Sequence, residues 1–355
     1  MPTSLLPSLL TSTLGASASV LGVIEGVSDA LAGVARLGGG ALADDPSRRR
    51  AVAVGGYAAT AVLSAATGGA TAVWQVGALR AGAWTARGLR VPSRNALLAD
   101  VVPPAAYGRA YGFERAMDNL GAIAGPLLAI GLVATVGTRW AIGLSAIPGL
   151  LAALAIIYAI RHTTAVQSRE RAPIRLRIAP VLHGDLRRLF AGISAFELGN
   201  CAATLMILRA TQLLEPGHSK DRATTIAIGL YVAYNVAATL TSLAAGQLPT
   251  GAAGFAIAYL GFTRDTANWL ALAPWFVLAG IGIGCAETAE HTAVAQAAPI
   301  DLRGSAFGLL AAIQSLGNLA ASTVAGVLWT ALSPTWAYGF LAASMIAATG
   351  LIARS

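Results

Sequence analysis

Charged residues are scarce in this chain of 355 residues, since Asp, Glu, Lys and Arg together make up 11% of it. Soluble globular proteins carry about 25% charged residues, so this composition argues against water as the main solvent. Hydrophobic residues make up 56% of the chain, and the mean hydropathy is +0.66. Apolar stretches of about 20 residues, each able to cross about 30 Å of hydrocarbon as a helix, recur along nearly the whole sequence. We therefore predict an all-α, polytopic membrane protein.

Cysteine and the sequence signatures of enzymes are also sparse. The two cysteines, Cys201 and Cys285, both lie in apolar segments, which argues against a disulfide framework and favours a role in helix packing. The sequence lacks a Walker loop, a dinucleotide fingerprint between a strand and a helix, and a nucleophile elbow. We therefore expect neither enzymatic activity nor a cofactor.

Apolar segments long enough to span the bilayer predict where the chain crosses it. Two further segments, at 2–14 and 249–263, are too short to span. Counting both gives twelve spans, with the first truncated and the ninth short, and we expect residues to be missing upstream of Met1. The ten segments of full length lie at about 17–42, 51–69, 71–98, 106–136, 139–160, 187–213, 222–248, 268–298, 303–331 and 334–353.

Arginine is distributed unevenly over the connections between these spans. Lys and Arg are retained on the cytoplasmic side, so this bias predicts that both termini are cytoplasmic and that the protein crosses the cell membrane many times. A basic inner face beside anionic lipid accounts for the net charge of +8, and we expect no nucleic-acid partner. The arginines of that side include Arg48, Arg49, Arg50, Arg109, those of the 161–188 connection, Arg303 and Arg354.

An internal repeat divides the chain, as is typical of secondary transporters. Around the second and eighth predicted spans the offset between the halves is 206, whereas further on it is 196, so about ten residues are missing before the tenth span. The repeat predicts a six-helix bundle at 1–160, a cytoplasmic linker at 161–186 and a second six-helix bundle at 187–355. The residues that recur 196 positions later are Pro103, Gly108, Ala110, Gly112, Ala116, Leu120 and Gly121, as Pro299, Gly304, Ala306, Gly308, Ala312, Leu316 and Gly317.

The stretch Gly40-Ala-Leu-Ala-Asp44-Asp-Pro-Ser47-Arg48-Arg49-Arg50 resembles the loop motif G-x-L-A-D-x-x-G-R-R of the major facilitator superfamily, with Ser47 in place of the usual glycine. In the second half, the corresponding loop from Gly246 has lost the aspartate and the basic residues. The resemblance implies that Gly40, Asp44, Arg48 and Arg49 belong to a gating loop.

A second motif and two longer blocks extend the resemblance. Gly121-Ala-Ile-Ala-Gly125-Pro126 resembles the G-x-x-x-G-P pattern of antiporter members of the superfamily, although small residues four apart favour close packing in any membrane bundle. The blocks 87–100 and 302–308 are similar to those of prokaryotic proton-linked exporters.

The resemblance implies two six-helix bundles around a cavity that opens alternately to each side. It points to proton-coupled efflux of a small molecule by a protein that functions as a monomer, with the substrate, protons and the lipid bilayer as its partners. An uptake permease or uniporter and a degenerate, non-transporting membrane protein are the alternatives, and an intramembrane metalloenzyme is a more distant one.

Ionisable residues within spans mark functional sites, because a charge at membrane depth is costly. Glu25, Asp29 and Arg36 lie within about 40° of one face of the second predicted span. Glu25 or Asp29 could carry a proton, or either could form a static ion pair with an arginine.

Arg80 lies near the middle of the fourth predicted span, and Asp118 on the fifth is its expected partner. Coupling to substrate or protons is one reading of this pair. The alternative is a charge network that closes the cytoplasmic side, formed by Arg87, Arg90, Arg94, Glu114, Arg115 and Asp118.

Glu287, Glu290 and His291 share one face of the tenth predicted span. They could form a proton relay, a substrate contact or a structural polar cluster. No second histidine lies nearby and H-E-x-x-H is absent, so no metal site is predicted. Glu197 and Asn235 are further candidates for the cavity, or they pack helices together by hydrogen bonding.

Overall fold

The computed structural model describes residues 2–162, 174–244 and 247–352, and these ranges contain helices and no strand. The all-α prediction is confirmed. Short helices connect the longer ones: the π-helix η1 (Leu9–Thr13), η2 (Thr67–Gly69), η3 (Pro104–Ala106) and η4 (Glu215–Gly217). The α-helices are α1 (Pro2–Ser8), α2 (Ala18–Ala43), α3 (Pro46–Ala66), α4 (Val73–Val101), α5 (Tyr107–Leu144), α6 (Ala146–His162), α7 (Ile178–Val181), α8 (Gly184–Glu197), α9 (Ala203–Leu214), α10 (Lys220–Leu243), α11 (Leu248–Phe262), α12 (Trp269–Ala297), α13 (Arg303–Ala331) and α14 (Pro334–Ile352).

Six helical stretches of the described chain are long and apolar enough to cross a membrane. The prediction of a polytopic membrane protein is confirmed, whereas the count of twelve spans stays a prediction. Helices α2 and α4 are long but carry charged residues, and α8, α9 and α11 have 14, 12 and 15 residues. The six stretches are Pro46–Gly69, Pro104–Ala159, Lys220–Leu243, Trp269–Ala297, Arg303–Ala331 and Pro334–Ile352.

The chain forms two compact units, each made of separate stretches. Unit 1 contains Met1–Pro103, Ala124–Val181 and Ala298–Ala312, and unit 2 contains Pro104–Ile123, Leu182–Ala297 and Ile313–Ser355. Helices α5 and α13 therefore each begin in one unit and end in the other. The bundles predicted at 1–160 and 187–355 stay a prediction, as does the linker between them, of which 163–173 lie outside the described residues.

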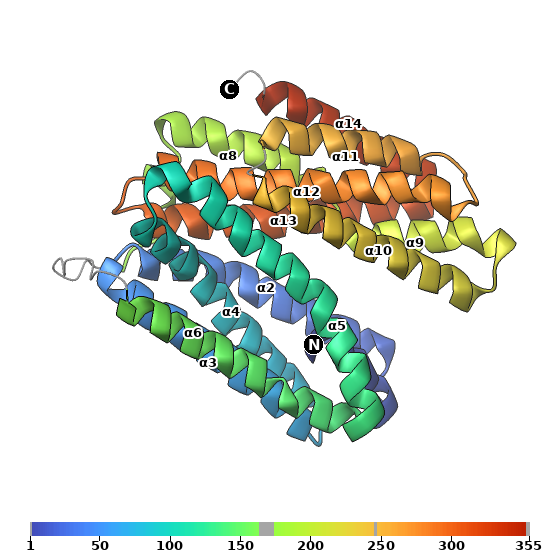
Figure 1. Cartoon of the computed structure of the whole chain (residues 1–355), viewed down its shortest axis with the longest axis horizontal. Helices are drawn as coiled ribbons and strands as arrows, with labels where there is room; N and C mark the ends of the chain where they lie inside the picture. The colour runs from blue at the N-terminus through green and yellow to red at the C-terminus, as the bar shows by residue number, and fades with distance from the viewer. Residues whose placement is uncertain (1, 163–173, 245–246, 353–355) are drawn as a thin grey trace. The chain divides into compact units, whose positions relative to one another are not determined.

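In unit 1, α4 packs along both α2 and α3, and α6 lies along α3 (Figure 1). The short first segment contributes to the core of this unit. Leu6, Leu9 and Leu10 are 2%, 0% and 0% exposed, and they belong to one apolar cluster with Val76 and Ile142. The N-terminal segment is thus held by burial of its leucines.

In unit 2, α12 packs against α10 and α11, and α14 packs on the other side of α11 (Figure 1). Aromatic rings fill the space between these helices. Phe262 lies edge-on to Phe276 with ring centroids 5.3 Å apart, and Tyr338 contacts both Phe262 and Tyr259.

Helix α3 begins at Pro46, earlier than the predicted start at 51. Asp45 caps this helix, because its carboxylate accepts a hydrogen bond of 2.9 Å from the Ser47 backbone N–H. Pro46 stands at the first helical position, where its missing N–H costs no hydrogen bond. The arginines of the loop motif consequently lie in the first turns of α3 rather than in a loop.

The predicted span 187–213 is wrong as a continuous helix, because α8 ends at Glu197 and α9 begins at Ala203. Side chains from α11 and α13 satisfy the backbone at this break. Ser322 accepts a hydrogen bond of 2.9 Å from the Ala202 N–H, and Asn318 donates one of 2.9 Å to the Asn200 carbonyl. A helix can open at membrane depth only where such partners are supplied.

Two other helix boundaries differ from the predicted spans. Gly137, at φ +79°, interrupts the helical backbone of α5 between the spans predicted at 106–136 and 139–160. Helix α10 ends at Leu243, before the predicted end at 248, and Gly246 of the second-half loop lies outside the described residues.

Candidate functional site

The last turn of α2 and the first turns of α13 approach backbone to backbone within unit 1. A Cβ atom added to Gly40 would lie 2.8 Å from the Gly304 carbonyl oxygen and 3.0 Å from the Gly308 Cα. Only glycine permits so close an approach. Asp44 covers the start of α13 by accepting hydrogen bonds from the Ser305 N–H (2.7 Å) and hydroxyl (2.5 Å). We call these five residues the α2–α13 crossing.

Asp44 lies in the connection between α2 and α3, and burial raises the pKa of its carboxyl. The hydrogen bonds from Ser305 and the charges of Arg177 and Arg49 oppose that increase without cancelling it. The buried carboxyl therefore takes up a proton at a higher pH than a solvated aspartate does. A fall in pH through this range favours the conformer that buries Asp44, and a rise disfavours it.

Arg49 is fully buried beside this crossing. Its guanidinium donates to both Asp100 carboxylate oxygens (2.8 and 2.6 Å), to the Ile300 carbonyl (3.0 Å) and to the Ala43 carbonyl. Arg303 also donates to Asp100, at 3.1 Å. One carboxylate thus pairs with two arginines.

The structure brings Gly40, Asp44 and Arg49 of the predicted gating loop together. Arg48 differs, since it pairs with Asp45 at 3.4 Å and its side chain is 26% exposed. Sequence reasoning missed the role of Asp100. Its signal was present in the block 87–100, where it is the one carboxylate and follows three arginines.

Glu25 of α2 and Arg80 of α4 form an ion pair of 2.6 Å, in which the Arg80 side chain is 5% exposed. Within unit 2, Asp118 pairs with Arg115 at 3.0 Å, and the predicted pairing of Arg80 with Asp118 stays a prediction. Helices α2 and α4 pack along their length, so side chains on their facing sides are close enough to pair. This geometry favours a static ion pair for Glu25.

The face predicted from Glu25, Asp29 and Arg36 is divided between two neighbouring helices. Asp29 accepts a hydrogen bond of 2.7 Å from the Trp84 indole of α4, whereas Arg36 donates to the Ala311 carbonyl of α13 at 3.0 Å. The Arg80 guanidinium lies 3.5 Å from the centroid of the Trp84 ring, within the range of a cation–π contact.

In unit 2, Arg115 of α5 binds carboxylates on two helices. It pairs with Glu114 at 2.8 Å and Asp118 at 3.0 Å on its own helix, and with Glu287 of α12 at 3.7 Å. His291 approaches the Glu287 carbonyl through Nδ1 at 2.8 Å, and its ring lies 5.7 Å from that of Tyr111. Part of the predicted charge network is thus present, together with the predicted tenth-span face.

Two further carboxyl groups of unit 2 are deeply buried. Glu290 of α12 is 0% exposed and accepts a hydrogen bond of 2.8 Å from the Gln314 amide. Glu197 of α8 is 2% exposed and accepts one of 3.0 Å from the Asn200 amide. Asn235, in contrast, donates to the Tyr231 carbonyl of its own helix at 2.8 Å, and its role in the cavity or in packing between helices stays a prediction.

Arg115 is the arginine that binds three carboxyl groups of unit 2, and His291 lies beside them. These three carboxyl groups are partly exposed, since the Glu114, Glu287 and Asp118 side chains are 15%, 28% and 52% exposed. A fully buried carboxyl, such as that of Glu290, is costly unless a proton or a cation neutralises it.

The antiporter-like motif lies in the middle of α5, which continues through Pro126. A Cβ atom added to Gly121 would find no heavy atom within 4 Å in the described structure, so this glycine marks no close contact there. The roles inferred for Gly121, Gly125 and Pro126 stay predictions. Among the residues that the structure describes, no group of three His, Cys, Asp or Glu is placed to hold a metal ion.

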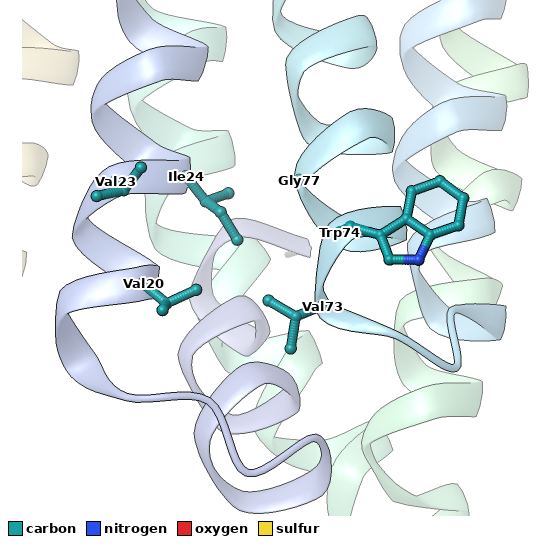
Figure 2. A pocket seen from close by; sticks show the side chains of 6 residues that line it. All are labelled: Val20, Val23, Ile24, Val73, Trp74 and Gly77. Carbon is teal, nitrogen blue, oxygen red and sulfur yellow. The ribbon is translucent and has the colours of Figure 1, made fainter.

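A pocket of about 490 Å³ lies between the first turns of α2 and α4, and Figure 2 shows its lining. Every side chain in it is apolar, and Trp74 is 72% exposed. None of the predicted site residues lines this pocket. Its residues are Val20, Val23, Ile24, Val73, Trp74 and Gly77.

The fold and these charges define a polytopic α-helical membrane protein with ionisable groups buried between its helices. The family model described as the Major Facilitator Superfamily matches residues 1–249. The chain therefore belongs to the major facilitator superfamily, as its motifs predicted.

Two relatives with curated sequences illustrate the similarity. An uncharacterised protein of Mycobacterium tuberculosis is 32% identical over 169 residues, which are 47% of this chain and 41% of that protein. This match spans less than half the length of the relative. An uncharacterised MFS-type transporter of Methanocaldococcus jannaschii is 27% identical over 356 residues, which cover 94% of this chain and 86% of the relative.

Solved structures share the fold. The human organic anion transporter MFSD10 (TETRAN) has a TM-score of 0.73 at 16% identity, covering 99% of this chain and 89% of that one. A bacterial homologue of the iron transporter ferroportin, in an outward-facing state, has a TM-score of 0.76 at 13% identity, and the match covers 99% of this chain and 94% of that one. The proton:xylose symporter XylE has a TM-score of 0.71 at 15% identity, and the match covers 99% of this chain and 92% of that one. At these identities the similarity shows the fold alone, and it confirms the predicted fold class.

Proposed function

We propose that the protein is a secondary active transporter that moves a small molecule across the cell membrane by alternating access, and that it is not an enzyme. The observation that carries this proposal is a helix contact that occurs twice, once within each unit. A Cβ atom added to Gly308 would lie 2.8 Å from the Arg36 carbonyl, and one added to Gly112 would overlap the Ser242 carbonyl.

These two contacts are equivalent in the internal repeat. Gly112 and Gly308 are 196 positions apart, and Arg36 and Ser242 are 206 apart, which are the two offsets of the repeat. Paired glycine contacts in repeated halves suit surfaces that close and open as rigid bodies, as alternating access requires.

Proton-coupled efflux is the form of transport that we propose. The buried carboxyl groups of Glu197 and Glu290 in unit 2 support proton coupling, because an ionisable group buried at membrane depth is costly and marks a candidate site for coupling. The resemblance of the blocks 87–100 and 302–308 to exporters supports the direction. The proposed partners are a small-molecule substrate, protons and lipid, and the protein is proposed to function as a monomer with both termini in the cytoplasm.

Everted membrane vesicles that contain a pH-sensitive dye test this function. Candidate substrates are added to energised vesicles, and we expect substrate-dependent proton movement that is absent from vesicles without the protein. Substrate flux without proton movement would favour a uniporter or permease. Silence with every substrate, in vesicles that contain the inserted full-length protein, would contradict transport and favour a degenerate membrane protein.

The predicted topology can be tested by cysteine labelling. Ser168, which lies outside the described residues, falls in the arginine-rich 161–188 connection, so Ser168→Cys is expected to react only from the cytoplasmic side. Ser219→Cys, at the exposed start of α10, is the matched position and is expected to react only from the other side. Cys201 and Cys285 are 3% and 5% exposed and give little background. Labelling of Ser168→Cys from outside would overturn the orientation.

A further inference from the structure

Polar side chains of α2 and α4 form two facing stripes within unit 1. On α4, Arg80, Trp84 and Arg87 lie at i, i+4 and i+7, so they share one side of the helix. On α2, Asp29 and Arg36 are seven positions apart and share a side for the same reason. The Trp84 indole joins the two stripes, because it donates a hydrogen bond of 2.7 Å to the Asp29 carboxylate. We call these five residues the α2–α4 seam.

Arg36 forms no ion pair with any carboxylate of the described residues. Its Nη1 donates to the Ala311 carbonyl at 3.0 Å, whereas its Nε is buried and has no hydrogen-bond partner in the described part of the chain. Asp29 attracts the Arg36 guanidinium from a greater distance, and Arg87 repels it. A guanidinium between membrane helices is costly unless an anion lies beside it. An anion that reaches Arg36 therefore gains both an ion pair and a hydrogen bond.

The unused edge of the Arg36 side chain fits a carboxylate. The edge formed by Nε and Nη2 does not involve Nη1, which is the atom that contacts Ala311. Paired N–H groups of this kind bind the two oxygens of a carboxylate side by side. A lysine would carry the same charge without the paired N–H groups. The geometry thus favours a ligand with a planar, two-oxygen anionic group.

The carboxyl groups of this region are already engaged, which favours an anion over a cation as the ligand. Glu25 pairs with Arg80 at 2.6 Å, and Asp29 accepts the hydrogen bond from Trp84. Together with Glu25, the seam holds three arginines and two carboxyls, so positive charge predominates on it.

Arg87 and Trp84 complete a surface for an organic anion. Arg87 is exposed and acts electrostatically on Arg36, so the two guanidiniums together raise the positive potential beside the seam. The Arg87 guanidinium lies 5.5 Å from the centroid of the Trp84 ring. The half-buried indole presents apolar carbon next to these charges. The seam therefore suits a carboxylate that is attached to a hydrocarbon or aromatic group.

We propose that Arg36, Arg87 and Trp84 form a binding site for an organic carboxylate, so that the transported small molecule is an organic anion. The carboxylate binds side-on to Nε and Nη2 of Arg36, Arg87 adds electrostatic attraction, and the carbon skeleton lies against Trp84. The proposal rests on the proposed transport function, because the covered Nε of Arg36 becomes accessible only when the protein changes conformer.

The contact with Ala311 links this site to the α2–α13 crossing. Gly308 lies one turn before Ala311 on α13, and a Cβ atom added to it would lie 2.8 Å from the Arg36 carbonyl. The hydrogen bond from Arg36 to Ala311 is therefore present only while α2 and α13 lie together. When these helices separate, Arg36 loses its acceptor and the carboxylate replaces it. The ligand consequently binds the separated conformer more tightly and shifts the population toward it.

Equilibrium binding to the purified full-length protein in detergent tests the site. Radiolabelled phenylacetate is the probe, since it joins a carboxylate to an aromatic ring, and we expect saturable binding. Phenylacetamide has nearly the same shape without the charge, and phenethylammonium has the opposite charge. Each is expected to compete at least about tenfold more weakly than unlabelled phenylacetate. Equal competition by phenylacetamide, or a failure of phenylacetate to bind, would overturn the assignment.

Variants place the binding at Arg36. Arg36→Gln removes the charge and the paired N–H groups, and it is expected to weaken phenylacetate binding at least about tenfold. Arg36→Lys keeps the charge and is expected to fall between Arg36→Gln and the wild type. Arg188→Gln is the matched control, because the Arg188 side chain is 74% exposed and lies outside the seam, and it is expected to bind as the wild type does. Wild-type affinity in Arg36→Gln would contradict the proposal.

Cysteine labelling provides a measurement that leaves Arg36 unchanged and so does not depend on the folding of its variants. Ala306 of α13 is 0% exposed, and Ala306→Cys is expected to react faster in the presence of phenylacetate, because the ligand favours the separated conformer. Phenylacetamide is expected to have no such effect. If phenylacetate leaves the labelling rate unchanged, the carboxylate does not replace Ala311 as the partner of Arg36, and the site is overturned.

Failure of this proposal is distinguishable from failure of the proposed function. Proton movement in vesicles with a substrate of another class, together with no binding of phenylacetate in detergent, would overturn the anion site and leave transport intact. Vesicles that are silent with every substrate would contradict the transport function itself, even where phenylacetate binds at Arg36.

Discussion

Replacing Asp100 by asparagine is expected to reduce strongly the amount of folded protein that is found in the membrane. Asp100 is 6% exposed at its side chain and forms ion pairs with Arg49, which is 0% exposed, and with Arg303, which is 10% exposed. Asparagine can accept one hydrogen bond through its oxygen but supplies no charge. Breaking a buried ion pair by removing one partner costs about 3–5 kcal/mol, because the other charge is left buried. Total stabilities of proteins are about 5–15 kcal/mol, so this loss is large.

The measurement is the yield and thermal stability of membrane-inserted protein, followed by size-exclusion chromatography of a fluorescent fusion. Asp301→Asn is the matched control, since Asp301 is exposed and lies 3.9 Å from Arg177, and such surface pairs contribute about 0–1 kcal/mol. The double variant Arg49→Met with Asp100→Leu should recover part of the loss, because removing both partners leaves no stranded Arg49 charge. If Asp100→Asn is as stable as Asp301→Asn, Asp100 does not hold these arginines in the membrane.

Contacts within a local motif could be predicted from the sequence. Gly40, Asp44 and Arg49 occur within ten positions, and their spacing matched a known pattern, so their convergence followed from the resemblance. Ser305 and Asp100, which complete the site, come from distant stretches. Spacing along the chain does not say which side chains on another helix will meet the motif.

Partners across helices were harder to predict because they depend on which faces pack together. Arg80 pairs with Glu25 because α2 packs along α4, and the position of Arg80 within its own helix does not identify that partner. The break after Glu197 was missed for a related reason. The apolar pattern continues through residues 198–207, and the groups that hold the break open, such as Ser322 and Tyr259, lie on other helices.

Replacing Gly40 by valine is expected to reduce transport by at least about tenfold while leaving the protein inserted. A valine side chain at Gly40 has no room, since its Cβ alone would lie 2.8 Å from the Gly304 carbonyl. The neighbouring atoms are backbone and cannot rotate away, so α2 and α13 must separate. Overpacking typically costs about 1–3 kcal/mol. A loss of about 1.4 kcal/mol from the closed conformer lowers its relative population about tenfold, and a cycle that passes through this conformer slows accordingly.

Gly33→Val is the matched control, because Gly33 lies on the same helix and a Cβ atom there meets no described heavy atom within 4 Å. Both variants replace a glycine of α2 by valine, so the intrinsic helix propensity and the added volume change equally. A difference between them therefore reflects the close contact at the α2–α13 crossing. Substrate flux in vesicles is measured together with labelling of Ala306→Cys, a position on α13 that is 0% exposed. We expect faster labelling and slower flux in Gly40→Val than in Gly33→Val. Equal labelling and equal flux would show that the close approach of Gly40 to Gly304 takes no part in transport, and the proposal of alternating access would then lose the contact on which it rests.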